Sequence, residues 1–199
     1  MSRARLLWVS GPVLRARADG PFRMREAVTI GSAGLLGEVV TVNGDDIVVQ
    51  VYEDPTGLRP GVEVKGTGKP LGIALGPGLL GNIFDGLLRP LSGCRTEYIE
   101  PGATGRAGCR FQFEPLVEPG HELAGGEVFG KARSGEDRIQ DCLLPPRVSG
   151  TVESIAGPGA FDEDAAVCRI RASGGEAHDV AMSHFWPVRE PRQIGRAHV

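Results

Sequence analysis

The stretch LLGEVVTVNGDDIVVQVY, residues 35–52, decides the fold, because two β-rich runs flank the turn sequence NGDD at residues 43–46. In the second run the residues at alternate positions, Ile47, Val49 and Val51, are all apolar and would share one face of a strand. A period of two indicates a strand with one buried face. Asn-Gly tolerates the positive φ of a tight turn, so the stretch predicts a β-hairpin.

Further short β-rich runs surround this hairpin within the first 75 residues. They lie at residues 6–10, 13–16, 27–30, 62–66 and 72–75, in addition to the hairpin strands at 35–42 and 47–52. This density predicts about six short strands in one small domain. Residues 1–75 are therefore expected to form a closed β-barrel, since closure leaves no sheet edge exposed.

A different period marks residues 76–92, which we predict to be a connecting helix or linker. Apolar residues recur there at helical spacing, and they are Leu79, Leu80, Ile83, Phe84, Leu87 and Leu88. GPG at residues 76–78 precedes the run and Pro90 ends it. Because Gly81 and Gly86 each weaken an isolated helix by about 1 kcal/mol relative to Ala, this helix should depend on packing.

Residues 93–189 return to short β-rich runs and predict a second, loop-rich β domain. The runs lie at residues 111–113, 123–130, 139–144, 148–155, 166–170 and 178–182. The glycine-punctuated cadence from Gly120 to Gly150 resembles barrel-sandwich domains of the lipoyl type, which carry a modified lysine at a hairpin tip. Lys131 lacks the expected flanking residues, so this likeness concerns the fold alone. The whole chain is predicted to be mainly β.

The composition excludes several classes of function. With a net charge of -3, a pI near 5.8 and 6% aromatic residues, the chain lacks the basic and stacking surfaces that nucleic-acid binding uses. Apolar runs are far shorter than the roughly 20 residues of a membrane helix, so direct membrane insertion is not expected. The four cysteines, Cys94, Cys109, Cys142 and Cys168, lack zinc or redox spacing, which favours reduced thiols in apolar niches.

A phosphate-binding loop of the form GxxxxGK[ST] does not occur in the 199 residues. The nearest imitation is GTGKP at residues 66–70. Glu63 stands five residues before Gly68, where glycine is required, and Pro70 replaces the hydroxyl residue that would meet magnesium. We therefore predict a strand-end turn there, with Lys69 as a solvated surface charge.

Acidic residues and histidines give no candidate catalytic, cofactor-binding or metal-binding site. Calcium and magnesium need several converging oxygens, so the acidic runs are interpreted as solvated turns; they contain Asp45, Asp46, Glu136, Asp137, Asp141, Asp162, Glu163 and Asp164. The three histidines considered, His121, His178 and His184, lack metal-ligand spacing. His178 and Asp179 are adjacent in a predicted strand and so point to opposite faces, which excludes a dyad.

Two motifs are the most specific in the chain, GPGLLGNIFDGLLRPL at residues 76–91 and WPVR at residues 186–189. Weaker motifs occur around them in a fixed order: GPV (11–13), GLLGEVV (34–40), QVYEDPTGLRPG (50–61), GTG (66–68), PL (70–71), FQFEP (111–115), PP (145–146) and GTV (150–152). Together they resemble the catalytic A subunit of V-type and archaeal-type rotary ATPases over nearly all of residues 9–192. Phe111 stands where that family usually has Trp, and Pro55 shifts the QVYE segment slightly.

The resemblance implies a fold and a set of partners. The spacing between the two strongest motifs holds a bulge domain, which neither the B subunit nor the F-type catalytic subunit has. Family barrels form a crown on an A3B3 ring with B subunits, the bulge is associated with the peripheral stalk, and a central rotor turns in the intact complex. The parent would be an ATPase or ATP synthase coupled to proton or sodium transport, cytoplasmic and peripheral to the membrane.

The resemblance also implies that the nucleotide chemistry lies outside this chain. ATP or ADP and Mg²⁺ would bind the intact parent, where magnesium helps stabilise the transferring phosphoryl group. This chain alone is expected to carry no cofactor and no activity, only ring-assembly and stalk-contact surfaces. Residues 190–199 are interpreted as the truncated start of the nucleotide-binding domain, ending in IGRAHV (194–199), which one reading frame of a common sequencing adapter encodes. A genuine polar terminus is the alternative.

Two other functions stay open from the sequence. The chain could be a free-standing all-β binding module without a catalytic domain. A reading frame continuing past Arg192 into GxxxxGKT would exclude the module, whereas a natural stop codon after Val199 would exclude the fragment. A relative of type III secretion or flagellar ATPases is a weaker option, because the bulge insertion argues against it.

Overall fold

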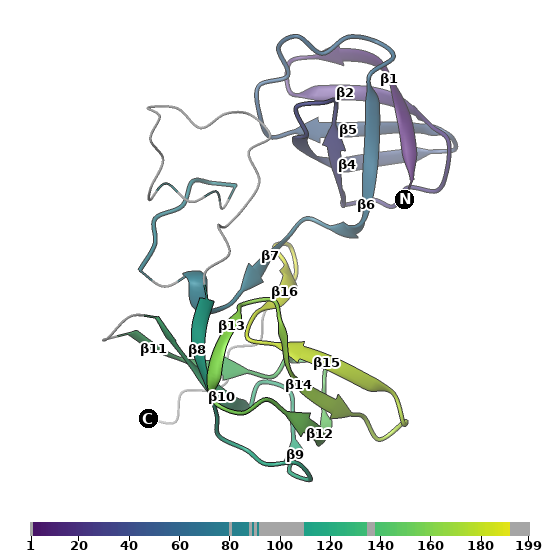
Figure 1. The fold of residues 1–199 in the computed structure, drawn as a ribbon. Coiled ribbons are helices and arrows are strands. Elements are labelled where there is room, and N and C mark those ends of the chain that lie inside the picture. The colour runs from purple at the N-terminus through teal and green to yellow at the C-terminus, as the bar shows by residue number, and fades with distance from the viewer. Residues whose placement is uncertain are drawn as a thin grey trace. The chain divides into compact units, whose positions relative to one another are not determined.

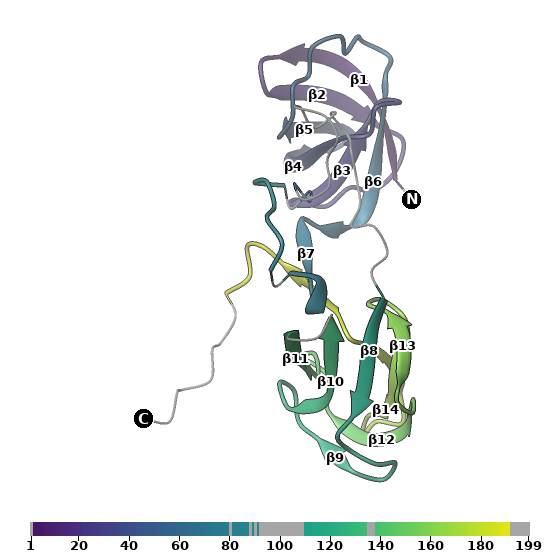
Figure 2. The same ribbon diagram turned by 60° about the vertical axis from the view of Figure 1, so that its left-hand side comes forward.

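The computed structural model describes residues 2–79, 81–87, 89, 91, 110–134 and 138–191, and nearly all of its regular structure is β-strand (Figures 1 and 2). The chain forms two compact units. Of the described residues, unit 1 holds 2–73 and 187–191, and unit 2 holds those between 74 and 186. None of the helices in this described part is long and apolar enough to cross a membrane.

Unit 1 is a closed six-stranded barrel, as the sequence predicted, with the strand order β1-β2-β5-β4-β3-β6, and every pairing in it is antiparallel (Figures 1 and 2). The strands are β1 (Arg3–Ser10), β2 (Val13–Ala18), β3 (Glu26–Ile30), β4 (Leu35–Asn43), β5 (Asp46–Val51) and β6 (Glu63–Pro70). The predicted hairpin joins β4 to β5. Asn43 faces Asp46 across its turn, and Gly44 takes the positive φ of 58°.

Alternation along each strand fills the interior of the barrel. Ile47, Val49 and Val51 are at most 3% exposed, whereas Gln50 between them faces solvent. Thirteen buried residues form one core, to which all six strands contribute; they are Ala4, Leu6, Leu14, Ala16, Phe22, Val28, Ile30, Leu35, Val39, Ile47, Val49, Val51 and Val64. Burial of this apolar surface, worth about 25 cal/mol per Å², is the main force that closes the barrel.

The predicted strand at residues 72–75 forms, but outside the barrel. It is β7 (Gly72–Leu75), and it pairs with β16 (His184–Pro187) in a two-stranded sheet. Because β6 already pairs with both β1 and β3, the barrel offers no free edge to a seventh strand. The chain thus leaves the barrel along β7 and returns beside it along β16.

The helix predicted over residues 79–88 is wrong. In the described part of residues 76–91 the one helical element is a short 3-10 helix, η1 (Pro77–Leu79), and residues 81–87 contain turns and an isolated bridge but no helix. Gly81 has a φ of 79°, which an α-helix cannot accommodate. The Leu91 N–H donates to the Ile83 carbonyl at 2.8 Å, so the segment folds back on itself as a loop.

A carboxylate holds this loop in place of helical hydrogen bonds. Asp85 accepts the backbone N–H groups of Leu87 at 3.0 Å and Arg89 at 2.8 Å, and its other oxygen accepts the Arg89 Nε at 2.6 Å. Asp side chains compete with the helical backbone in this way. The bonds to two N–H groups and to Arg89 hold the pKa of the Asp85 carboxyl below its usual value against the opposing effect of burial, which is the largest single influence.

Unit 2 contains two four-stranded sheets with the orders β11-β10-β8-β13 and β15-β14-β12-β9. Their strands are β8 (Arg110–Pro115), β9 (Glu122–Leu123), β10 (Val128–Ser134), β11 (Arg138–Leu143), β12 (Gly150–Ile155), β13 (Gly159–Asp162), β14 (Ala166–Arg171) and β15 (Ala177–Ala181). The predicted β domain is confirmed. Strand β13 was not predicted, because its four residues follow Gly157-Pro158 and carry little β-rich pattern.

One core joins both sheets of unit 2 and makes it a sandwich. Phe113 and Phe129 from one sheet are buried in the same cluster as Val152, Ile170 and Val180 from the other. Phe113 lies at the centre, with its ring 6.1 Å from that of Phe129 and 6.2 Å, edge to face, from that of Phe161. Such aromatic pairs add to the stabilisation from burial.

Substituting Phe113→Ala should remove the centre of this core and destabilise unit 2 by about 3–5 kcal/mol. Urea unfolding followed by circular dichroism measures the loss. Ile139→Ala is the matched control, because Ile139 is 53% exposed on the same sheet and should change the unfolding free energy by less than about 0.5 kcal/mol. Equal effects of both substitutions would contradict the assigned core.

Candidate functional site

Three motifs that are far apart in sequence meet at one buried carboxylate in unit 1. Glu38 of GLLGEVV is 1% exposed. The guanidinium of Arg189, from WPVR, binds it in a bidentate manner, with Nε 2.8 Å from Oε1 and Nη2 2.6 Å from Oε2. The Tyr52 hydroxyl, from QVYE, donates to Oε2 at 2.5 Å. We call Glu38, Tyr52 and Arg189 the barrel clamp.

Backbone pairing brings each member of the clamp into place. Glu38 lies on β4 opposite Gln50 of β5, and Tyr52 follows directly after β5. The Tyr52 N–H donates to the Leu36 carbonyl at 3.0 Å, so the chain after β5 stays against β4. On the returning segment the Val188 N–H donates to the Leu71 carbonyl at 3.0 Å, which sets the position of Arg189.

In the clamp Glu38 and Arg189 are charged and Tyr52 is neutral, and each residue stabilises the protonation state of the others. The hydrogen bonds from Arg189 lower the pKa of the Glu38 carboxyl, and they outweigh burial, which acts in the opposite direction. Burial and the neighbouring Glu38 carboxylate raise the pKa of Tyr52, so its hydroxyl stays protonated as a donor. The bond to Glu38 raises the pKa of Arg189. Because this carboxylate is 1% exposed and both of its oxygens accept bonds from within unit 1, we interpret its role as structural.

The GTGKP segment lies within β6, so the predicted strand-end turn is a β-bulge instead. Glu26 of β3 faces Pro70 while Val28 faces Gly66, which leaves extra residues on β6. Gly68 takes a φ of 72° there. The buried Glu26 carboxylate accepts the Gly68 N–H at 2.9 Å and the Arg23 N–H at 2.9 Å. A phosphate does not fit, since an anion already occupies the amide that would bind it.

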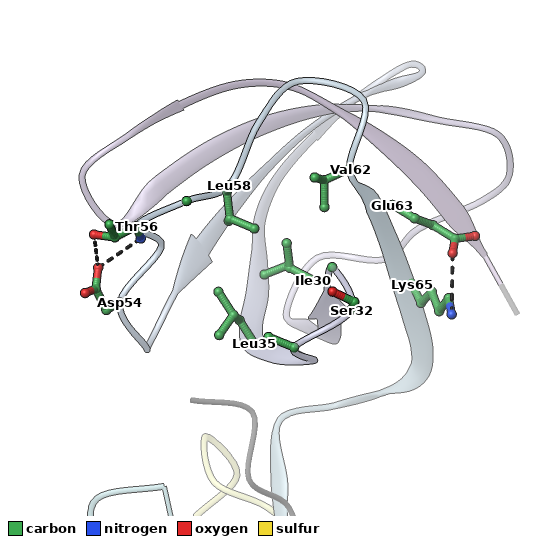
Figure 3. A pocket seen from close by; sticks show the side chains of 12 residues that line it. Ile30, Ser32, Leu35, Asp54, Thr56, Leu58, Val62, Glu63 and Lys65 are labelled. Carbon is green, nitrogen blue, oxygen red and sulfur yellow. Dashed lines mark hydrogen bonds and ion pairs between the residues drawn. The ribbon is translucent and has the colours of Figure 1, made fainter. Parts of the chain in front are cut away.

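A hollow of about 770 Å³ lies at the mouth of the barrel (Figure 3). Ile30, Leu35, Leu58 and Val62 line its apolar part. The polar groups at its rim already bond one another. Asp54 accepts the Thr56 hydroxyl at 2.6 Å and Lys65 lies 3.4 Å from Glu63. The hollow therefore has apolar walls but no set of polar groups converging on a ligand.

Where the structure describes them, the acidic runs noted in the sequence do not converge on one site, and Asp46 and Glu163 form ion pairs or hydrogen bonds within the protein. Asp46 accepts Arg15 at 2.6 Å and lies 3.2 Å from Arg17, so it is ion-paired rather than merely solvated. The Glu163 carboxylate accepts the Gly78 N–H at 3.3 Å. No cluster of three metal-ligating side chains occurs among the described residues. Glu136 and Asp137 lie outside them.

The histidine and cysteine positions also differ from those of a reactive site. His178 lies 3.9 Å from Glu176, whereas its neighbour Asp179 pairs with Arg169 at 3.6 Å, as expected for opposite faces of β15. Cys142 and Cys168 are buried free thiols, which confirms that prediction for these two. Burial raises the pKa of Cys142 to about 12 and that of Cys168 to about 11. Cys94 and Cys109 lie outside the described residues.

Sequence reasoning missed the barrel clamp as a unit. It quoted all three segments as motifs but assigned no role to Glu38, Tyr52 or Arg189. Alternation along β4 gives no signal for Glu38, because Leu35 and Val39 face the core and Glu38 lies on the opposite face of the strand, beside the exposed Gln50. Its partner could not be found, since Arg189 lies 151 positions away.

Comparison with known proteins gives two family matches. Residues 8–68 match the model for the ATP synthase alpha/beta family, beta-barrel domain, and residues 107–189 match the ATPsynthase alpha/beta subunit barrel-sandwich domain. The A subunit of the A-type ATP synthase of Methanopyrus kandleri is 38% identical over 98% of this chain and 34% of its own length. That of Thermococcus sibiricus is 36% identical over 94% and 33%. The chain thus spans about a third of these relatives.

Substituting Arg189→Ala should lower the free energy of unfolding of unit 1, because Glu38 would stay buried without its charged donor. Half of the Arg189 side chain is exposed, so water replaces part of the lost interaction. Urea unfolding measures the effect. Arg59→Ala, in an exposed loop of the same unit, is the control and should be nearly neutral.

The clamp should also make stability depend on pH. The pKa of Glu38 is lower in the folded chain than its ordinary value near 4.5, so its contribution is complete above that value and is lost as pH falls through the folded pKa. Unfolding free energies of the natural chain and Glu38→Gln should differ by a constant amount between about pH 8 and 6 and converge below about pH 4.5. A difference that grew on acidification would contradict the assignment.

Proposed function

Because this chain belongs to the ATP synthase alpha/beta family and matches the A subunit of A-type ATP synthases over nearly its whole length, we propose that it is the N-terminal part of the catalytic A subunit of a rotary ATPase or ATP synthase. The observation that carries the proposal is the order of two units, a closed barrel followed by a barrel-sandwich. The complete protein would couple ATP synthesis or hydrolysis to proton or sodium transport.

The nucleotide chemistry belongs, in this proposal, to the two thirds of the sequence that the relatives have in addition. ATP or ADP with Mg²⁺ would bind there and not to the present chain. Two features support this division. The sequence has no GxxxxGK[ST] loop, and the similar segment GTGKP is a bulge whose Gly68 amide bonds the Glu26 carboxylate. A negative charge at that position repels a phosphate.

The two units would then serve assembly. The barrel would lie beside the B subunits in an A3B3 ring, and the barrel-sandwich would contact the peripheral stalk, while the central rotor would interact with other parts of the complex. The complex would hold the chain at the cytoplasmic side of the membrane as a peripheral component. The barrel clamp supports this role, because it ties the segment after β16 to the barrel wall through Arg189 and Glu38.

A chimera tests the proposal. Residues 1–191 of this chain replace the matching third of the Methanopyrus kandleri protein, and the product is combined with the other subunits of that enzyme. The chimera should assemble and hydrolyse ATP, because the barrel and barrel-sandwich supply surfaces and not catalytic groups. The 199-residue chain alone should show no hydrolysis and no saturable ATP binding in equilibrium dialysis.

Two results would contradict the proposal. One is saturable binding of ATP to the chain alone. The other is a folded chimera that stays monomeric under conditions in which the unmodified Methanopyrus kandleri protein enters the complex. That unmodified protein is the positive control for assembly, and a Phe113→Ala chimera is the control for loss of folding.

A further inference from the structure

One outer face of the barrel concentrates positive charge. The outward side chains of β1 and β2, with the adjacent end of β6, include Arg3, Arg5, Trp8, Arg15, Arg17 and Lys65, and we call them the arginine–tryptophan face. All six are exposed, and the inward residues of the same strands, such as Leu6 and Ala16, are at most 1% exposed. Strands β1 and β2 lie side by side in both views (Figures 1 and 2).

Like charges lie directly opposite each other on this face. Arg5 faces Arg17 across the β1–β2 pair, and Arg3 faces Lys65 across the β1–β6 pair. Cross-strand like-charge pairs destabilise a sheet. The chain as a whole has a net charge of -3, so this local excess of cations does not reflect the composition. Arg5 and Arg17 also face carboxylates on their other neighbouring strands, Glu63 and Asp46 respectively, but the face still holds more cations than carboxylates.

The carboxylates near the face compensate only part of its charge. Glu63 lies within 3.5 Å of both Arg3 and Lys65, and Asp46 within 3.2 Å of both Arg15 and Arg17. Each carboxylate therefore serves two cations. Arg5 faces Glu63 across the β1–β6 pair, but it has no carboxylate within 4.0 Å among the described residues. The face can accept further carboxylates without losing the pairs that it already makes.

An exposed tryptophan lies at the end of the face formed by Arg15. Trp8 is 55% exposed and stands opposite Arg15. A shift in the β1–β2 register between Leu6 and Trp8 adds Leu7, 42% exposed, to the same surface. Trp and Arg are the residue types most enriched among the residues that dominate binding energy in protein interfaces. A large exposed aromatic side chain within a cationic surface indicates a docking site.

We propose that the arginine–tryptophan face binds the barrel of the neighbouring, non-identical subunit in the ring, at a surface that combines carboxylates with an apolar recess for Trp8. This inference rests on the proposed function. A closed barrel has no strand edge for a partner to extend, so a partner can bind only to an outer face or an end. Charge complementarity then requires an acidic partner.

A second copy of this chain does not fit the face. A two-fold dimer through it would place Arg5 and Arg17 of one protomer against the same residues of the other, since such an interface uses the same patch on both sides. The repulsion disfavours that contact. A heterologous neighbour, whose surface can differ in sign, avoids it, and this agrees with a ring built from two alternating kinds of subunit.

The chimera described above tests the face. Trp8→Ser and the double substitution Arg5→Glu/Arg17→Glu should each weaken association with the Methanopyrus kandleri B subunit by more than about tenfold, measured by sedimentation and native mass spectrometry. Rising salt should weaken the natural chimera and affect the Arg5→Glu/Arg17→Glu chimera much less. Met24→Ser, at a 64% exposed position away from β1 and β2, and Arg59→Glu are matched controls that should leave association unchanged.

The outcomes separate the two proposals. If the natural chimera does not assemble, the proposed function fails and this inference fails with it. If it assembles and the face variants, folded by circular dichroism, assemble equally well, only the inference is overturned. Self-association of the 199-residue chain that Trp8→Ser abolishes would overturn it in favour of a homodimer. Binding of a labelled single-stranded oligonucleotide that requires Arg5 and Arg17 would overturn it in favour of a nucleic-acid surface.

Discussion

The bidentate bond between Arg189 and the buried Glu38 is the constraint on which the architecture of this chain depends. A carboxylate buried against the outer face of a barrel is costly unless a cation and further hydrogen bonds satisfy it. Here the cation is supplied 151 positions later, after the chain has built a complete second unit. Glu38 therefore receives its charged donor only from the segment that follows β16.

A second buried carboxylate, Glu26, receives its hydrogen bonds from a different kind of donor. This difference explains the GTG motif. Glu38 uses a side-chain cation, whereas Glu26 uses backbone N–H groups, one of them from the bulge at Gly68. Gly66 must lack a side chain, because a Cβ there would lie 2.4 Å from the Glu26 carboxylate oxygen. The glycines of GTG thus allow a close approach between backbone and an internal carboxylate. The same chemical need, amides near an anion, makes such segments resemble phosphate-binding loops.

Local pattern predicted the barrel, since alternation at Ile47, Val49 and Val51 and the turn at Gly44 depend only on neighbouring residues. The same kind of reasoning failed for the helix predicted over residues 79–88, because other local hydrogen bonds compete there with helical ones. The leucines of residues 79–88 keep a helical period, yet Gly81 adopts a left-handed φ and Asp85 captures the nearby amides, so a loop forms. The clamp was beyond such reasoning for a different reason. No local rule links Glu38 to Arg189, because a β-fold sets their separation through pairings that are distant in sequence.

The buried and the exposed charged side chains of unit 1 differ in how fully they are paired. Its two buried carboxylates, Glu26 and Glu38, each receive hydrogen bonds from within the chain. On the outer surface of β1 and β2, by contrast, two carboxylates are divided among four cations, and Arg5 stands opposite Arg17. Cross-strand pairing of Arg5 with Glu63 and of Arg17 with Asp46 offsets part of this repulsion, but the cations still outnumber the carboxylates. The surplus is understandable if the missing counter-charges belong to another protein that binds this face.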